Sequence, residues 1–249
     1  MSELLKIATY NIHKGFSHFN RRMVLHELRE CLGTLDADVV FLQEVLGEHT
    51  LHPQRYHNYP DSPQHEFLAE QRWAHCCYGK NCVYDAGHHG NAILSRHPIH
   101  ASDNRDISAH RFESRGLLYS QVELAEGRVL HCFCAHLGLF ARGRRTQLRE
   151  MAQHVAHRAP EGEPVIIAGD FNDWRNEAGN ILHRELGVVD AFVARHGKPA
   201  KSFPAPTPVL PLDRIYVRGL EVVEADVHAD HPWDRVSDHA ALTATLRLP

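Results

Sequence analysis

The chain has 249 residues, of which 43% are hydrophobic, and its formal net charge is −4. Its sequence pI of about 6.6 argues against a free-standing nucleic-acid-binding protein, although a nuclease needs only a local basic groove. The N-terminus lacks an apolar segment of signal-peptide length, and no window approaches the roughly 18 uninterrupted apolar residues of a transmembrane helix. We therefore expect a cytoplasmic protein without an integral membrane span.

The cysteines and histidines of the chain offer metal ligands, but their spacing is unfavourable. Six cysteines occur, none of them in the C-x-x-C pairs of a structural zinc site, and we expect all of them to be reduced thiols. Most of the 22 histidines lie in polar stretches, and we interpret them as solvated loop residues. A zinc-binding protein that uses Cys82, His88 and His89 is an alternative with little support from the spacing.

Hydrophobic periodicity predicts a strand, a helix and a second strand at the start of the chain. These elements are expected at residues 5–12, 21–35 and 39–42. The second strand is expected to stop at Gln43 and Glu44. Residues 45–90 lack regular periodicity, so we expect substrate-facing loops there, around a helix and a short strand near residues 72–83.

The remainder of the chain predicts short strands and helices, without repeats or low-complexity linkers, so we expect a single domain over residues 1–249. Strands are expected at residues 90–96, 115–124, 129–137, 165–168, 212–217, 220–227 and 242–248. Helices are expected at residues 142–155 and 177–186. Arg142, Arg144 and Arg145 begin the first of these helices and either line an anionic groove or form a solvated face.

Residues 165–172 carry the most informative pattern in the chain. An apolar run typical of a buried strand breaks at Gly169 and is followed by Asp170 and Asn172. Such a strand end delivers a carboxylate and an amide to the rim of a sheet, where proteins often place their chemistry. The alternative is an Asx-type turn, which Asp and Asn favour.

Other predicted strands also end in polar residues. Asn11 and Glu44 follow the first two strands, and amide and carboxylate oxygens are hard donors of the kind that Mg²⁺ accepts. The alternatives are a turn residue at position 11 and a solvated strand end at position 44. Further polar strand ends carry His136, Asp213, and Asp238 with His239.

The order of these segments is more specific than any one of them. The set Thr-Tyr-Asn-Ile, Gln-Glu, Gly-Asn-Ala-Ile-Leu-Ser-Arg, His-Leu, Gly-Asp-Phe-Asn, Leu-Asp-Arg-Ile and Ser-Asp-His resembles the endonuclease/exonuclease/phosphatase superfamily, which has the deoxyribonuclease-I-like fold. The resemblance extends from Tyr10 to His239. It implies an α+β fold, a four-layer α/β/β/α sandwich of two packed mixed sheets, with the site at one edge of the sheets. It also implies divalent-metal-dependent cleavage of a phosphate ester.

The resemblance implies a metal and phosphate site among the polar strand ends. Glu44 resembles the principal Mg²⁺ ligand, with Asn11 and Asp238 nearby. Mn²⁺ could substitute for Mg²⁺. A single cation held by one or two carboxylates keeps an open face for phosphate, so elementary chemistry agrees with this assignment.

The resemblance also implies catalytic roles. Asp170 resembles the residue that orients or deprotonates the attacking water, and Asn172 resembles a phosphate contact. His239 resembles the invariant catalytic histidine and Asp213 the carboxylate that hydrogen-bonds it. His136 matches the second histidine of the deoxyribonuclease, sphingomyelinase and deadenylase branches. An Asp–His pair favours the protonated imidazole, but Asp170 and a neutral His239 both remain candidates for the general base.

We therefore expect a Mg²⁺-dependent phosphodiesterase that hydrolyses a nucleic-acid or phospholipid-type diester, and we expect a monomer. One alternative is a phosphomonoesterase that acts on an inositol-type or another small phosphate ester. A second alternative is a non-catalytic binding module with the same fold. The acidic charge and the lack of interleaved aromatic and basic residues weaken the assignment to nucleic acid.

Overall fold

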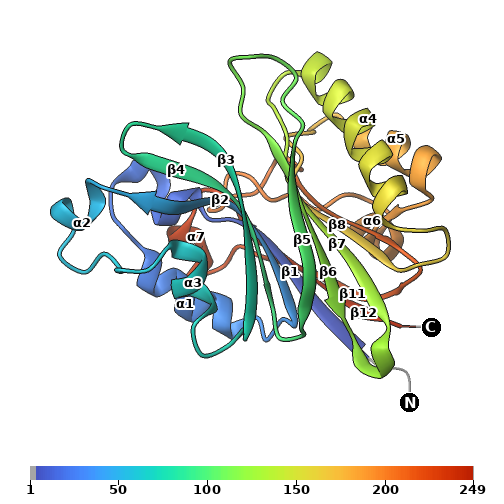
Figure 1. The fold of residues 1–249 in the computed structure, drawn as a ribbon, viewed down its shortest axis with the longest axis horizontal. Helices are drawn as coiled ribbons and strands as arrows, with labels where there is room; N and C mark the ends of the chain where they lie inside the picture. Colours follow the sequence, from blue (N-terminus) through green and yellow to red (C-terminus); the bar gives the residue numbers. More distant parts are fainter. Residues whose placement is uncertain (1–3, 249) are drawn as a thin grey trace.

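The computed structural model describes residues 4–248, which form two six-stranded mixed sheets packed against each other (Figure 1). The first sheet has the strand order β11-β12-β1-β2-β4-β3, with bounds Glu221–His228, Ala241–Arg247, Leu4–Asn11, Val39–His49, Gly87–Ser95 and His75–Tyr84. The second sheet has the order β5-β6-β7-β8-β10-β9, with bounds Ile99–Asp106, Gly116–Glu123, Val129–His136, Val165–Asp170, Asp213–Arg218 and Val189–Asp190.

Helices cover the outer face of each sheet, as Figure 1 shows. The helices on the side of the first sheet are α1 (Leu25–Thr34), α2 (His52–Arg55), α3 (Gln64–Ala69) and α7 (Trp233–Val236). The helices on the side of the second sheet are α4 (Ala141–Arg158) and α5 (Glu177–Leu186), whereas α6 (Ala191–His196) packs against β10 of the second sheet and β11 of the first and contributes to the core between the sheets. Three short 3-10 helices are η1 (His13–Gly15), η2 (His18–Asn20) and η3 (Ala125–Gly127). The predicted four-layer sandwich of two mixed sheets is therefore confirmed.

Alternation along the strands divides the core into three apolar layers. On β7, Cys132 and Cys134 face the first sheet, whereas Phe133 and Ala135 pack toward α4 and α5. The central strands are thus buried on both faces, which is why their sequences are continuous apolar runs rather than alternating ones. None of the helices within residues 4–248 is long and apolar enough to cross a bilayer.

Parallel pairing brings several strand ends to one edge of the sandwich. β1 pairs parallel with β2 in the first sheet, so Asn11 lies beside Gln43, and β7 pairs parallel with β8 in the second sheet, so His136 lies beside Asp170. β10 runs antiparallel to β8 and begins at that edge with Asp213. The topology of each sheet and the packing of the two sheets against each other together gather the polar strand ends, as the 3.1 Å hydrogen bond from Asn11 Nδ2 to Asp170 Oδ2 shows.

The region of residues 45–90 contains the strand predicted near residues 72–83, as β3, but it is more regular around that strand than the predicted loops. β2 does not stop at Glu44 but continues to His49, and β3 and β4 form an antiparallel pair. A register shift between β2 and β4 interrupts the apolar alternation, so the sequence pattern concealed the second half of β2 and the start of β4 at Gly87. The edge strand β5 was missed because its sequence is polar, and α1 begins at Leu25 rather than at residue 21.

Candidate active site

The ends of β7, β8 and β10 place three of the predicted site residues side by side. His136 lies opposite Asp170 in the parallel pair, and Asp170 lies opposite Asp213 in the antiparallel pair. Their exposed fractions are 8%, 1% and 1%. Ionisable groups held this far from water interact strongly with their neighbours, so their mutual distances decide their charge states.

Gly169 lies inside β8 rather than ending it, so the predicted strand break at this residue is wrong. Its φ is +145°, and a Cβ there would lie 1.9 Å from the carbonyl oxygen of Ala135, so the close approach of β8 to β7 requires glycine. The predicted Asx-type turn follows directly, because Asp170 Oδ1 accepts a hydrogen bond of 2.9 Å from the backbone N–H of Asn172. Asn172 Nδ2 in turn donates to the carbonyl oxygen of Leu137 at 2.9 Å.

Three residues converge on the second oxygen of Asp170, Oδ2. Asn11 Nδ2 donates to it at 3.1 Å, His136 Nε2 lies 3.5 Å away and His239 Nε2 lies 3.7 Å away. Burial raises the pKa of Asp170, and the two histidines only partly offset that effect. A carboxylate with a raised pKa accepts a proton more readily than an exposed one, which suits a general base.

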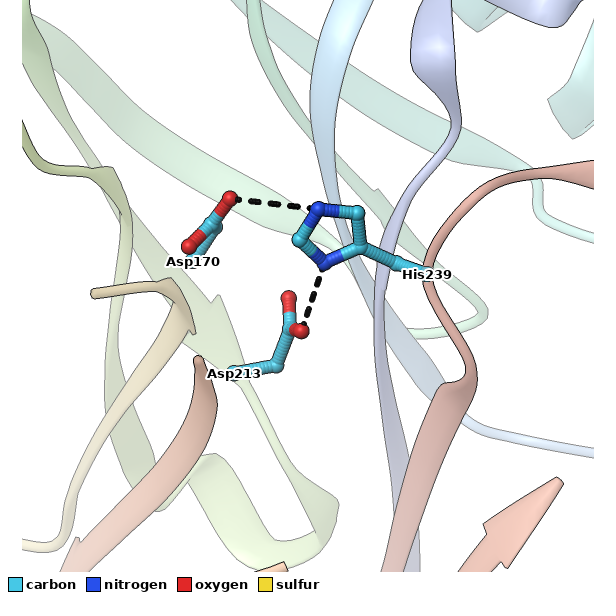
Figure 2. Close-up of side chains that lie close together, drawn as sticks. All are labelled: Asp170, Asp213 and His239. Carbon is cyan, nitrogen blue, oxygen red and sulfur yellow. Dashed lines mark hydrogen bonds and ion pairs between the residues drawn. The ribbon is translucent and has the colours of Figure 1, made fainter. Parts of the chain in front are cut away.

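A second carboxylate holds His239 from the other side of its ring. His239 Nδ1 donates to Asp213 Oδ2 at 2.7 Å, while Nε2 faces Asp170 (Figure 2). Ser202 Oγ also donates to Asp213 Oδ2, at 2.5 Å, and accepts the backbone N–H of Asp213 at 3.1 Å. Burial favours the neutral ring, but Asp213 and Asp170 outweigh it and raise the pKa of His239 to about 10. His239 is therefore an imidazolium at neutral pH.

His136 has the opposite charge state. Burial, followed by the positive charge of Arg115, lowers the pKa of His136 to about 4, so the ring is neutral at neutral pH. Two histidines near one carboxylate oxygen thus differ in charge, because Asp213 bonds the far nitrogen of His239.

Glu44 reaches the site from a β-bulge. The β2–β4 ladder shifts register at this residue, whose φ is +56°. Asn11 Nδ2 lies 3.5 Å from Glu44 Oε1, and Lys14 Nζ lies 2.7 Å from Oε2. Burial alone would raise the pKa of Glu44, but His136, which is protonated at the low pH where Glu44 titrates, and the ammonium group of Lys14 lower it well below its ordinary range. Glu44 is therefore ionised and directed into the site.

Asp238 joins the site through the segment that precedes β12. Its Oδ2 lies 3.3 Å from His13 Nδ1, and Ser237 Oγ donates to the carbonyl oxygen of Asn11 at 2.7 Å. Burial raises the pKa of Asp238, but the hydrogen bond from His13 and the charge of His239 lower it by a larger amount, so the pKa lies below its ordinary value. Asp238 is thus a second ionised carboxylate beside β1.

The residues with oxygen donors fit the cation that the resemblance implies. Two ionised carboxylates, Glu44 and Asp238, and the amide of Asn11 are hard donors of the kind that suits Mg²⁺. Asn11 turns its Nδ2 toward Glu44 and accepts the backbone N–H of His13 with Oδ1 at 3.1 Å. Its amide would have to rotate by half a turn before its oxygen could join the carboxylate of Glu44 on a cation.

Asp170, Asp213 and His239 also bring donor atoms within 4.8 Å of one another, and within residues 4–248 they are the one such group of three. We interpret this group as a hydrogen-bonded acid–base unit, because the Nδ1 atom of His239 and the Oδ2 atom of Asp213 already bond each other at 2.7 Å. Cys82, His88 and His89 form no such group, which removes the geometric basis of the alternative zinc site.

Sequence analysis did not identify Lys14, Ser202 or Arg115, which contact or electrostatically influence the site. The sequence could have indicated Lys14, because it lies between the end of a predicted strand and Gly15, as other site residues lie at strand ends. Ser202 lies in a proline-rich segment where serine is ordinary, and Arg115 begins a predicted strand, so neither pattern indicated a role.

Comparison with known proteins agrees with this fold. A model of the endonuclease/exonuclease/phosphatase family matches residues 8–239, and the chain belongs to this family, whose members are phosphoesterase hydrolases. The uncharacterized protein YbhP of Escherichia coli (strain K12) is 46% identical to the chain over 244 residues, which cover 98% of this chain and 96% of YbhP.

Solved structures share the fold at low sequence identity. TDP2 of D. rerio, in a complex with a single-strand DNA product, superposes with a TM-score of 0.74 at 21% identity, over 98% of this chain and 99% of that one. A mannosyl-6-phosphatase of Bacteroides thetaiotaomicron superposes with a TM-score of 0.72 at 16% identity, over 97% of this chain and 99% of that one. The same sandwich therefore occurs in proteins whose substrates differ.

Proposed function

We propose that the chain is a divalent-metal-dependent phosphodiesterase that uses Mg²⁺. The observation that carries this proposal is the line of contacts from Asp213 through His239 to Asp170, buried at one sheet edge beside the ionised Glu44. The line places the imidazolium of His239, a fixed positive hydrogen-bond donor, beside the buried carboxylate of Asp170. Attack of water on a phosphate ester needs a base for the water and a donor for the charge that develops on the phosphate.

The charge states of the two groups support Asp170 as the general base. His239 is already protonated at neutral pH, so it cannot accept a proton from water. Asp170, whose pKa is raised by burial, takes that role, and the Nε2–H of His239 donates a hydrogen bond to a phosphoryl oxygen. The neutral His136, whose Nε2 lies 3.5 Å from Asp170 Oδ2, would donate a second hydrogen bond to the phosphate from the same side of Asp170 as His239. The amide of Asn172, fixed by Leu137, offers its second N–H to the phosphate.

Glu44 and Asp238, with Asn11 after rotation of its amide, would hold the cation. Such a cation supplies Lewis-acid stabilisation of the charge that develops on the non-bridging phosphate oxygens. Lys14, which now contacts Glu44 Oε2, would be left to contact the phosphate instead. The chain's own residues thus provide a base, two histidine donors and an ammonium group around one phosphate.

Net charge favours a diester over a monoester. Four carboxylates, those of Glu44, Asp170, Asp213 and Asp238, face two cations, Lys14 and the imidazolium of His239, because Arg115 is paired with Glu113, its Nε atom lying 4.0 Å from Oε1. Their difference is two negative charges, which a divalent cation would cancel. A phosphodiester then adds one negative charge to the site, whereas a phosphomonoester dianion adds two, which is less favourable in a buried site.

The direct test is hydrolysis of bis(p-nitrophenyl) phosphate with Mg²⁺ and with EDTA. We expect activity that EDTA abolishes, and we expect Asp170→Asn and His239→Gln each to reduce kcat by roughly 10²-fold or more. His154→Gln is the matched control, because His154 is a buried histidine, 5% exposed, that bonds Asp103 in another part of the second sheet. Full activity in either site variant would contradict the proposal.

The same assay separates the two alternatives. Release of inorganic phosphate from p-nitrophenyl phosphate at a kcat/KM above that for the diester would identify a phosphomonoesterase. Mg²⁺-dependent thermal stabilisation without turnover of any ester would identify a binding module.

A further inference from the structure

A cavity of about 300 Å³ opens beside the candidate active site. Its walls come from the β5–β6 connection, with Phe112 and Arg115, from the β7–α4 connection, with Leu139 and Phe140, and from His89 on β4. None of these residues has a part in the acid–base unit of Asp170 and His239. The cavity is therefore a separate feature whose chemistry requires its own explanation.

The cavity adjoins the site directly. The backbone N–H of Leu137, two residues before Leu139, donates to the carbonyl oxygen of Asp170 at 2.8 Å. Arg115, on the opposite wall, is close enough for its charge to act on His136. His89 interacts electrostatically with Glu44. A phosphate ester bound at Asp170 would consequently place one of its ester groups at the mouth of the cavity.

Hydrogen bonds fix the two walls in relation to each other. Glu113 Oε2 accepts Gln147 Nε2 at 2.7 Å and the backbone N–H of Ala109 at 3.0 Å. Gln147 Oε1 accepts the backbone N–H of Gly138 at 2.9 Å, so one glutamine ties both connections to α4. Arg144 donates to the carbonyl oxygen of Leu139 at 2.5 Å. A cavity built in this way exists before a ligand arrives, which lowers the entropic cost of binding.

The rim of the cavity is apolar and exposed. Phe112, Leu139 and Phe140 are 82%, 58% and 74% exposed, although large apolar side chains are ordinarily buried. A contiguous exposed apolar patch beside a polar cleft marks a surface that contacts a ligand. Arg115 adds a guanidinium whose Nε atom is buried without a hydrogen-bond partner among residues 4–248, although it lies 4.0 Å from Glu113 Oε1 in an ion pair. The guanidinium of Arg111 covers one face of the Phe112 ring, 4.5 Å from its centroid, and leaves the other face for a ligand. The cavity therefore offers aromatic faces beside a guanidinium.

The residues that line the cavity favour a heteroaromatic ester group over a lipid acyl chain. Besides the apolar rim, His89, His110 and Ser114 contribute polar atoms to the walls. A lipid acyl chain would bury these polar atoms without a partner, which is unfavourable. A planar heteroaromatic ring stacks on phenyl faces and presents hydrogen-bonding edges to polar walls. The volume accommodates one such ring with its sugar, and it is too small for a base pair of a duplex.

We propose that this cavity is the subsite for a single nucleobase carried by the ester group next to the reacting phosphate, with Phe112 and Phe140 as the stacking faces and Arg115 as the hydrogen-bond donor. The inference rests on the proposed phosphodiesterase function and narrows its substrate to a nucleotide ester or the end of a single strand.

The test compares two ligands that differ only in the base, thymidine 5′-monophosphate and 2-deoxyribose 5-phosphate. Their binding to the full chain in Mg²⁺ is measured by calorimetry, and their inhibition constants are measured against bis(p-nitrophenyl) phosphate. We expect the nucleotide to bind at least about 10-fold more tightly, because stacking on aromatic side chains favours a base. The double variant Phe112→Ala with Phe140→Ala should reduce this preference to about 3-fold or less.

Two further variants make the result specific. Phe140→Trp keeps an aromatic face and should retain the preference, which separates stacking from a general structural role. Val189→Ala is the control, because Val189 is 41% exposed on β9, at the opposite edge of the second sheet from β5. Circular dichroism and thermal midpoints show whether each variant is folded.

Equal binding of the two ligands to the unaltered protein would overturn the inference, and so would a preference that survives the double variant. Tighter binding of a short-chain lysoglycerophosphodiester than of the nucleotide, lost in the double variant, would assign the cavity to an acyl chain and also overturn it. Base-dependent binding by calorimetry without hydrolysis of any ester would instead reject the phosphodiesterase function and leave the base subsite standing.

Discussion

Replacing Asp213 by asparagine tests the charge state of His239 with little change in shape. The asparagine side chain would still present an oxygen to His239 Nδ1, and Ser202 Oγ would still donate to that same oxygen. The substitution therefore removes a negative charge that lies 2.7 Å from the ring while keeping its hydrogen bond. Any change in the pKa of His239 then reports electrostatics rather than lost geometry.

The structure sets the size of the expected effect. A pKa raised from about 6.5 to about 10 corresponds to roughly 5 kcal/mol in favour of the imidazolium. Asp170 is 3.7 Å from the ring, and Asp213 is 2.7 Å from it with a direct hydrogen bond, so we assign about half of this energy to Asp213. The pKa of His239 should then fall to roughly 8 in the variant, and kcat should fall about 10²-fold or more.

The pKa is measured by following the His239 Cε1–H resonance across pH in the metal-free protein. Stability gives a second measure with a definite sign. Because folding raises the pKa of His239, its contribution is present below about pH 6.5 and is lost as the pH rises through about 10. Asp213→Asn should therefore destabilise the protein by about 2–3 kcal/mol at pH 6 and by much less near pH 10. A His239 that titrates near pH 6.5 in the unaltered protein, or near pH 10 in the variant, would refute this account.

Three further substitutions test other contacts. Lys14→Gln removes the ammonium 2.7 Å from Glu44 and should tighten Mn²⁺ binding, measured by electron paramagnetic resonance, by roughly 3- to 10-fold; an unchanged or weaker affinity would show that Lys14 does not compete with the cation. Gly169→Ala forces a Cβ within 1.9 Å of Ala135 O and should lower the free energy of unfolding in urea by about 3 kcal/mol or more; a midpoint equal to that of the unaltered protein would contradict the observed backbone. Arg214→Met leaves the buried carboxylate of Asp190 without its ion-pair partner at 3.4 Å and should lower the free energy of unfolding by about 3–5 kcal/mol. Adding Asp190→Asn should recover part of that loss in thermal unfolding, whereas losses that simply add would argue against the ion pair.

The strand-end residues could be predicted from the sequence because their placement follows from simple rules. Apolar runs identified the buried strands, and parallel strands end at one edge, so His136 and Asp170 had to lie near each other once the pairing was right. The packing of the two sheets then brings Asn11 within 3.1 Å of Asp170. The order of the motifs supplied the pairing through the family resemblance, and the family and the two-sheet fold are confirmed. The predicted roles of these residues stay predictions that the experiments above address.

The sequence could not predict features that depend on local irregularity or on distant contacts. Glu44 was expected at the end of a strand, but it occupies a bulge in a strand that continues to His49. A bulge depends on how a strand pairs with its neighbouring strand, and the local sequence of one strand does not specify that pairing. Ser202 and Arg115 likewise acquire their positions from tertiary packing, and a serine in a proline-rich segment carries no signal of contact with Asp213.

Backbone conformation at the site explains why its geometry needs support from beyond the strand ends. His13, Lys14, Glu44 and Asn172 all have positive φ values, of 44°, 58°, 56° and 48°, although none is glycine. Each such conformation costs on the order of 1 kcal/mol and persists only where the surroundings fix it. Gln64 provides one such restraint, since its Nε2 donates to the carbonyl oxygen of Lys14 at 2.8 Å. The strained backbone thus lowers the stability of the fold but fixes the charged groups before a substrate binds. Groups fixed in advance need no reorganisation when negative charge develops on a phosphate.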